Sequence, residues 1–169
     1  VVYMPSPVRF RRHSQPHVRL ATWLGVYESS TAAVGLADNA TVRLDLDNEP
    51  QPDLVLFKTG TPDAQAAISE DDYIDGAPEL VVEIASSSAS YDLNQKKGAY
   101  LRNGVREYLA WVVLEERLVW WRLDGGEYVG IAPDEGGVLK SMVFPGLWLD
   151  VPALLRGEMR AVLECLEKG

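Results

Sequence analysis

The sequence contains one cysteine, and no apolar run in it is long enough to cross a membrane. Cys165 is the single cysteine, so a disulfide within the chain and a thiolate metal cluster are both excluded. A membrane-spanning helix needs about 20 consecutive apolar residues, and the N-terminal region has no apolar secretion core. These absences predict a protein of the reducing cytoplasm that makes no use of the membrane.

Positive charge is also scarce. The chain has 16 lysine and arginine residues against 25 acidic residues, which gives a formal net charge of -9. This balance argues against a broad basic face for nucleic acid, so any contact with DNA would have to be local and assisted by metal ions. A basic cluster, Arg9, Arg11, Arg12 and His13, closes segment 1–13, which we predict to be a short strand or a loop.

Length and composition predict one globular domain. The 169 residues, of which 47% are hydrophobic, are enough for one full core and too few for two. The chain does not begin with Met, which indicates a trimmed or partial N-terminus.

Segment 78–85 carries the strongest sign of chemistry. Its aliphatic and β-branched residues predict a buried strand, yet Glu83 lies inside it with no basic neighbour in the sequence. A buried, ionised carboxylate is costly unless it has a partner. Glu83 is therefore predicted either to pair with a distant cation or to bind a metal ion.

Residues 15–29 are predicted to form the first helix. Ser14 suits the N-cap and Pro16 suits the first turn. His17 and Glu28 share the apolar face of this helix at helical spacing. For His17 we favour a hydrogen bond near the cap over a place in a site, and Glu28 is open to both interpretations.

Two strands are predicted to follow. Alternating apolar residues predict a half-buried strand over 41–47, and a buried strand follows a turn over 53–57. Asp53 comes directly after Pro52, so its carboxylate stands at the beginning of a buried strand. Residues 58–77 predict an excursion over the surface that carries a solvated acid run.

The middle of the chain predicts a β-α-β unit. A strand over 79–85 leads to a helix that begins at Asp92, its predicted N-cap, and stops at Gly104. A third apolar strand over 107–113 completes a right-handed crossover, which places the two strands parallel in one sheet. The rest of the chain predicts strands over 117–123, 127–131 and 138–149, and an amphipathic helix that begins at Pro152.

Asp53, Glu83 and Lys96 could converge on one divalent ion. If their strands are neighbours, the two carboxylates can hold Mg²⁺ (or Mn²⁺), which completes its coordination with water and substrate phosphate. Lys96, about one turn into the helix after Glu83, could orient a water and stabilise the charge of a phosphate. The alternative is a buried carboxylate–lysine pair that stabilises the junction of sheet and helix, and composition alone leaves the two readings about equal.

The spacing of these motifs resembles a known family. The motifs are Pro52-Asp53, Val82-Glu83-Ile84 with Ser86 and Ser88, then Asp92, Lys96 and Tyr100 in a D-x-x-x-K-x-x-x-Y spacing, and finally Gly104-Val105 and Glu107-Tyr108. Together they resemble a large bacterial family of putative restriction endonucleases, part of the PD-(D/E)XK nuclease superfamily. The similarity runs from about residue 3 to about residue 155.

The resemblance implies a fold and a set of site residues. The fold is a single α/β domain with a restriction-endonuclease-like core, in which helices flank a mixed central sheet. The implied metal ligands are Asp53 and Glu83, joined by the carbonyl of Ile84, and Lys96 is the implied active-site lysine. The superfamily's lysine usually stands two residues after the second acid, where this chain has Ala85.

Further residues are predicted to support this site. Glu28 and Glu49 are candidates for a third acid, and His17, Ser86, Asp92 and Tyr100 are supporting candidates. Neither a G-x-S-x-G motif nor a phosphate-binding glycine loop occurs.

The leading hypothesis is a Mg²⁺-dependent endonuclease that acts on DNA. The main alternative is a partner-binding or regulatory module that keeps the nuclease fold without turnover, and a weaker one is hydrolysis of RNA or of a small phosphoester. Cleavage of a duplex by a one-site subunit favours a homodimer. The strands that carry Trp120, Trp121 and Trp148 are the predicted interface.

Overall fold

The computed structural model describes residues 8–86 and 91–169, with only the backbone described for residues 91 and 92. Its centre is a six-stranded sheet with the strand order β1-β3-β6-β7-β8-β9. These strands are β1 (Val34–Asp38), β3 (Leu54–Lys58), β6 (Leu80–Ala85), β7 (Glu107–Val112), β8 (Arg117–Asp124) and β9 (Glu127–Gly130). β6 and β7 are parallel, and the other neighbouring pairs are antiparallel. The predicted mixed sheet and its β-α-β crossover are confirmed.

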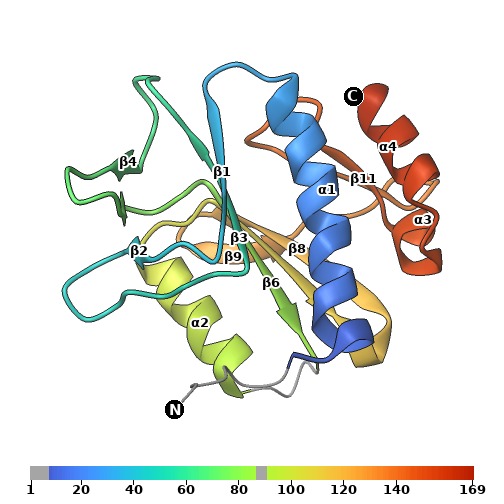
Figure 1. The fold of residues 1–169 in the computed structure, drawn as a ribbon, viewed down its shortest axis with the longest axis horizontal. Helices are drawn as coiled ribbons and strands as arrows, with labels where there is room; N and C mark the ends of the chain where they lie inside the picture. The colour runs from blue at the N-terminus through green and yellow to red at the C-terminus, as the bar shows by residue number, and fades with distance from the viewer. Residues whose placement is uncertain (1–7, 87–90) are drawn as a thin grey trace, which may run out of the picture.

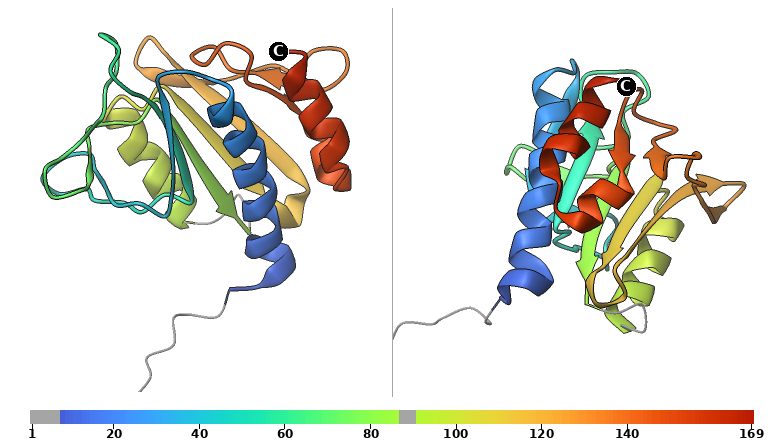
Figure 2. Two further views of the ribbon diagram at one scale, coloured as in Figure 1. Left: turned by 45° about the horizontal axis from the view of Figure 1, so that its top comes forward. Right: turned by 90° about the vertical axis from the view of Figure 1, so that its right-hand side faces the viewer.

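Helices cover both faces of this sheet (Figures 1 and 2). On one face lies α1 (Gln15–Ser29), preceded by the π-helical turn η1 (Phe10–Ser14), and on the other lies α2 (Tyr91–Arg102). The α1 face also carries α3 (Val151–Arg156), α4 (Met159–Glu167) and the hairpin of β10 (Val138–Lys140) and β11 (Trp148–Asp150). A three-stranded sheet of β2 (Val42–Arg43), β4 (Ala67–Ile68) and β5 (Ile74–Asp75) packs beside α2, and η2 (Val113–Glu115) follows β7.

Among the helices of residues 8–86 and 91–169, none combines the length and the apolar character needed to cross a membrane.

The alternation of side chains along β6 divides the core into two. Leu80, Val82 and Ile84 belong to the apolar cluster under α1, whereas Val81 belongs to the cluster under α2. Because successive side chains of a strand point to opposite faces, Glu83 lies on the α2 side. The acid therefore stands within reach of polar groups that α2 presents to the sheet.

Aromatic contacts fix α1 on its face of the sheet. Trp23 packs edge-on against Trp120 with ring centroids 5.8 Å apart, and its Nε1–H donates to the carbonyl of Trp148. The hydroxyl of Tyr27 donates to the carbonyl of Pro145 at 2.9 Å. Trp120 is 1% exposed and enclosed by the chain itself, so its own side chain has no part in a subunit interface, and the predicted interface on these strands stays a prediction.

The first helix and the strand at 53–57 occur as predicted, but the region around them differs. Segment 41–47 contributes only β2, because Leu46 is fully exposed and Asp45 turns back on Asn48 through backbone and side-chain bonds. β1 was not predicted. Its sequence, Val-Gly-Leu-Ala-Asp, has two small residues and carries little apolar alternation.

The C-terminal region also differs from expectation. Segment 138–149 is a hairpin rather than one strand, since the chain turns at Pro145 and at Gly146, which has φ 80°. The predicted C-terminal helix is broken into α3 and α4 at Gly157, which has φ 77° and caps α3 in the left-handed conformation.

Candidate active site

The register of the central sheet brings Asp53 and Glu83 together. In the antiparallel pair of β3 and β6, Leu54 lies opposite Val82 and Val55 lies opposite Val81. The next pair in this ladder is Asp53 and Glu83, one residue before the start of β3. Residues directly opposite each other in such a pair have their Cβ atoms about 4.5–5.5 Å apart. Two acids 30 positions apart in the chain are therefore neighbours on the α2 face.

Asp53 is held by two hydrogen bonds, one to each of its carboxylate oxygens. Its side chain is mostly buried, and Oδ2 accepts from the backbone N–H of Ile84 at 2.7 Å. Oδ1 accepts from Nε2 of His13 at 2.9 Å. Since a carboxylate only accepts, His13 carries its proton on Nε2 in this contact. The two bonds fix the carboxylate of Asp53 beside the strand that carries Glu83.

Glu83 is 4% exposed, and α2 supplies its polar partners. Oε1 accepts from the hydroxyl of Tyr100 at 2.6 Å and lies 3.5 Å from Nζ of Lys96. The pKa of Glu83 is raised to about 7, chiefly by burial; Lys96 and Tyr100 act against this rise, and the nearby Asp53 carboxylate adds to it. The site thus holds a carboxylate whose negative charge is only partly offset by the chain.

The spacing of α2 explains why Lys96 and Tyr100 meet the same carboxylate. Residues four positions apart share one face of a helix, and here that face is turned toward Glu83. The ring of Tyr100 is fully buried and lies 5.2 Å from that of Tyr108, while Lys97 turns away to sit 3.9 Å over the ring of Trp121. Burial raises the pKa of Tyr100, so its hydroxyl stays protonated and can only donate to an ionised Glu83.

An open cleft of about 290 Å³ lies over these groups. It is lined by His13, Asp53, Glu83, Ile84, Ala85, Ser86, Leu93 and Lys96. Asp53, Glu83 and Lys96 therefore converge on one solvent-accessible space. Since a water molecule occupies about 30 Å³ of liquid, the cleft has room for a hydrated ion and a phosphate group.

The side chains at the cleft suit a metal ion that prefers oxygen ligands and takes only a few of them from the protein. Within the part of the chain that the structure describes, there is no group of three or more His, Cys, Asp and Glu side chains placed to hold a metal. Two carboxylates with partly uncompensated charge remain, and Mg²⁺ is commonly bound by one or two carboxylates while it keeps several waters. The chemistry of Asp53 and Glu83 suits Mg²⁺ or Mn²⁺ better than zinc, which takes three or four protein ligands.

The two histidines take different roles around Asp53. Nε2 of His17 lies 3.1 Å from the backbone oxygen of Asp53 and 3.0 Å from Oδ1 of Asp38, so it ties the start of β3 to the end of β1. His13, which lines the cleft, was not predicted as a site residue. Its only signal in the sequence was its place in the basic cluster just before the helix.

The remaining candidates are placed as follows. Ser86 lines the cleft, whereas the side chain of Asp92 and the whole of Ser88 lie outside the described residues. Glu49 lines a neighbouring hollow with its side chain 59% exposed. Glu28 is not brought to the site, because it lies near the opposite end of α1 from His17, about 16 Å along a helix that rises about 1.5 Å per residue.

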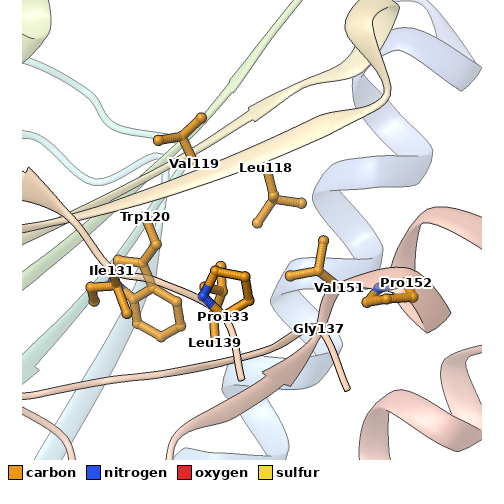
Figure 3. Close-up of a pocket in the computed structure, with 9 residues that line it drawn as sticks. All are labelled: Leu118, Val119, Trp120, Ile131, Pro133, Gly137, Leu139, Val151 and Pro152. Carbon is orange, nitrogen blue, oxygen red and sulfur yellow. The ribbon is translucent and has the colours of Figure 1, made fainter. Parts of the chain in front are cut away.

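An apolar hollow lies elsewhere on the molecule, between β8 and the start of α3 (Figure 3). Its lining residues are Leu118, Val119, Trp120, Ile131, Pro133, Gly137, Leu139, Val151 and Pro152. None of these side chains is titratable, so this hollow supplies no acid, base or metal ligand. By contrast, the cleft over Asp53 and Glu83 brings two carboxylates, a lysine and a histidine to one space.

Comparisons with known proteins agree with this architecture. A model of the Uma2 family, described as "Putative restriction endonuclease", matches residues 1–152. The crystal structure of a putative nuclease belonging to DUF820 from Anabaena variabilis superposes with a TM-score of 0.67 at 15% sequence identity, over 92% of this chain and 85% of that chain. At this identity the superposition shows a shared fold. No curated protein matches the chain.

Proposed function

Because the chain belongs to the Uma2 family of putative restriction endonucleases, we propose that it is a metal-dependent endonuclease that hydrolyses phosphodiester bonds of DNA. The observation that carries the proposal is the convergence of Asp53, Glu83 and Lys96 on one open cleft. Two carboxylates and an amine around a hydrated space are the groups that metal-assisted phosphodiester hydrolysis needs.

In this proposal Asp53 and Glu83 hold Mg²⁺ or Mn²⁺, with the carbonyl of Ile84 as a further ligand. When bound, the ion supplies Lewis acidity and lowers the pKa of a coordinated water. Lys96 places its ammonium group where it orients the attacking water or stabilises the charge of the scissile phosphate. Tyr100 and His13 keep the two carboxylates oriented by donating to Glu83 and Asp53.

Ala85 distinguishes this site from the usual arrangement of the superfamily. At this position Ala85 lines the cleft with no charge of its own, and Lys96 brings an ammonium group to Glu83 from α2 instead. The lysine is thus supplied from the helix that follows the strand, and its role is part of the proposal.

The proposal is tested by removing each acid. D53N and E83Q should each lower Mg²⁺- or Mn²⁺-dependent cleavage of plasmid DNA by at least about 1,000-fold, since either change takes away a ligand of the catalytic ion. E167Q is the matched control, because Glu167 is an exposed carboxyl on α4. Metal-dependent cleavage that survives in the D53N/E83Q double variant would reject the assignment.

A second candidate function is a partner-binding or regulatory module without turnover. It is favoured by Ala85, which leaves the usual lysine position empty of charge, and by the net charge of -9. Calorimetric titration with Mn²⁺ separates the two, because a module without turnover has no need of an ion at Asp53 and Glu83. A panel of DNA, RNA and small phosphoesters distinguishes the third, weaker candidate.

We also propose that the enzyme works as a homodimer, since one site per subunit cuts one strand at a time. Trp121 and Trp148 are half-buried in the single chain, and β9 is an edge strand of the sheet with Val129 42% exposed. Sedimentation at micromolar concentration is expected to give the mass of two chains. A single-chain mass at all concentrations would contradict this assembly.

A further inference from the structure

A basic turn stands directly beside the cleft. The turn consists of residues 9–13, and two of its arginines, Arg9 and Arg12, line a hollow of about 390 Å³. That hollow shares His13, Ile84 and Ser86 with the cleft over the two acids. The two spaces are therefore adjacent, and a ligand that leaves the cleft on this side meets two guanidinium groups.

The turn is anchored, while its arginine side chains are exposed to solvent. The backbone N–H groups of His13 and Ser14 both donate to the carbonyl of Arg9, and His13 bonds to Asp53. No residue of η1 is buried, and Arg9, Arg11 and Arg12 form no ion pair within residues 8–86 and 91–169. π-helical turns are rare and frequently occur at functional sites.

Elsewhere in the chain arginines are commonly neutralised by neighbouring carboxylates. Those with a carboxylate partner are Arg43, Arg106, Arg117, Arg122 and Arg156. In a protein with a net charge of -9, three guanidinium groups on one short turn, with no carboxylate partner among the described residues, form a local cationic surface. Such a surface attracts an anion. Because the basic turn lies beside the cleft, an anion bound to the turn lies next to the cleft.

A second hollow borders the cleft at Lys96 and has a mixed charge. Its lining residues include Asp47, Glu49 and Arg102. The side chain of Glu49 is 59% exposed there. The two carboxylates there offset the charges of Lys96 and Arg102, whereas the hollow beside the turn is lined by Arg9 and Arg12 and, among the described residues, by no carboxylate, so the turn offers the more favourable side for a phosphate backbone.

Resting on the proposed function, we infer that the basic turn binds the phosphate backbone of the DNA strand next to the scissile bond, through Arg9 and Arg12. The strand runs from the cleft onto the turn and away from Asp47 and Glu49. Each guanidinium presents a fork of N–H donors that matches a phosphate in two contacts. The turn thereby supplies the local positive charge that the acidic chain as a whole lacks.

The inference is tested by measuring how DNA binding depends on salt. Binding of labelled duplex DNA is followed by fluorescence anisotropy in EDTA, where metal-dependent cleavage cannot interfere. Each phosphate contact contributes about 0.9 to the slope of log K against log salt for duplex DNA and about 0.7 for a single strand. R9A/R12A should therefore lower the slope by about 1.8 with a duplex, or about 1.4 with a single strand of the same sequence.

Two further variants make the result specific. R156A/R160A removes two exposed arginines of α3 and α4 that line neither the cleft nor the hollow beside the turn, and should bind DNA like the wild type. R9K/R12K keeps the charge and should restore most of the slope. Thermal unfolding of R9A/R12A close to that of the wild type shows that the fold is intact, because neither residue is buried.

The outcomes separate this inference from the catalytic proposal. DNA binding that depends on Arg9 and Arg12 supports the inference even if no cleavage is found. Equal binding by R9A/R12A and R156A/R160A overturns it even if the wild type cleaves DNA at Asp53 and Glu83. A wild-type chain that binds neither DNA probe at low salt overturns the inference and leaves no basis for the DNA substrate.

Discussion

The hydroxyl of Tyr100 donates a 2.6 Å hydrogen bond to Oε1 of Glu83, and both side chains are buried. A hydrogen bond to an ionised group stabilises a protein by about 1.5–3 kcal/mol, roughly twice the value for a neutral pair. The strength of this contact therefore depends on whether Glu83 is ionised. Since burial raises the pKa of Glu83 to about 7, the contact is charge-assisted above that pH.

Y100F is expected to destabilise the metal-free protein in a pH-dependent way. At pH 8 the loss should be about 1.5–3 kcal/mol, measured by urea unfolding, because an ionised Glu83 loses its donor. At pH 5.5, where Glu83 is protonated, the loss should be about 1 kcal/mol. Y128F is the matched control, since Tyr128 donates to the uncharged carbonyl of Val105 at 2.8 Å. A cost for Y100F that is equal to that of Y128F at both pH values would rule out the charged contact.

Glu83 itself is expected to lower the stability of the metal-free protein as pH rises. Burial raises the pKa of Glu83 from 4.5 to about 7 in the folded protein, so the folded state binds this proton more tightly than the unfolded state. The contribution of this proton to the free energy of unfolding is complete below pH 4.5, falls between pH 4.5 and about 7, and is lost above that window. A shift of this size corresponds to about 3 kcal/mol.

E83Q removes this titration while it nearly keeps the shape of the side chain. In EDTA the variant should be more stable than the wild type at pH 8, and the difference should vanish toward pH 4.5. The difference between the two proteins is the relevant quantity, because burial also raises the pKa of Glu107 and adds to the pH dependence of both. Parallel curves for wild type and E83Q across this window would contradict the prediction.

Lys96 is expected to act on the rate more than on metal affinity. K96A should lower kcat by about 100-fold or more, since it removes the ammonium group from the cleft, while calorimetry should show Mn²⁺ binding retained. K96R keeps the charge and should recover part of the rate. If K96A instead loses Mn²⁺ binding while kcat stays unchanged, Lys96 supports Glu83 as a metal ligand and does not act on the rate.

The position of Ala85 allows a second test of the same group. In K96A/A85K the lysine is moved to the strand position that the superfamily usually uses, and Ala85 already lines the cleft. Partial recovery of kcat relative to K96A is expected. The reaction needs an ammonium group near the phosphate, and the backbone position that supplies this group matters less. The single variant A85K controls for overpacking of the cleft.

The sequence predicted the parts of this site that depend on local pattern. The strand around Glu83, the helix with Lys96 and Tyr100, and the parallel strand after them follow from apolar runs and a clear helix stop at Gly104. From the sequence, Asp53 and Glu83 could be predicted to meet only if their two strands were neighbours in the sheet. The register of Leu54 opposite Val82 meets that condition.

What the sequence could not reveal depends on tertiary contacts or weak patterns. His13 reaches Asp53 because a π-helical turn carries it there, and no periodicity in residues 9–13 indicates that turn. The break at Gly157 was missed because the apolar residues of α3 and α4 keep a helical spacing across it. β1 has little pattern of its own and depends on the edge of β3.

His13 offers the sharpest test of how Asp53 is positioned. Its Nε2–H donates to Oδ1 of Asp53 at 2.9 Å, while Ile84 holds the other oxygen. Partners that orient a metal ligand typically change metal affinity or activity by about 10–100-fold when removed. H13A should therefore weaken Mn²⁺ binding and lower kcat within that range, and H13Q, which keeps a donor, should recover part of both.

H17A is the comparison that separates positioning from stability. His17 bonds to the backbone oxygen of Asp53 and to Asp38, and does not line the cleft. Its removal should lower the unfolding temperature with little change in Mn²⁺ affinity, because the carboxylate of Asp53 keeps both of its donors. If H13A and H17A instead shift stability and Mn²⁺ affinity in the same proportion, His13 only holds the turn in place, and the orientation of Asp53 depends on Ile84 alone.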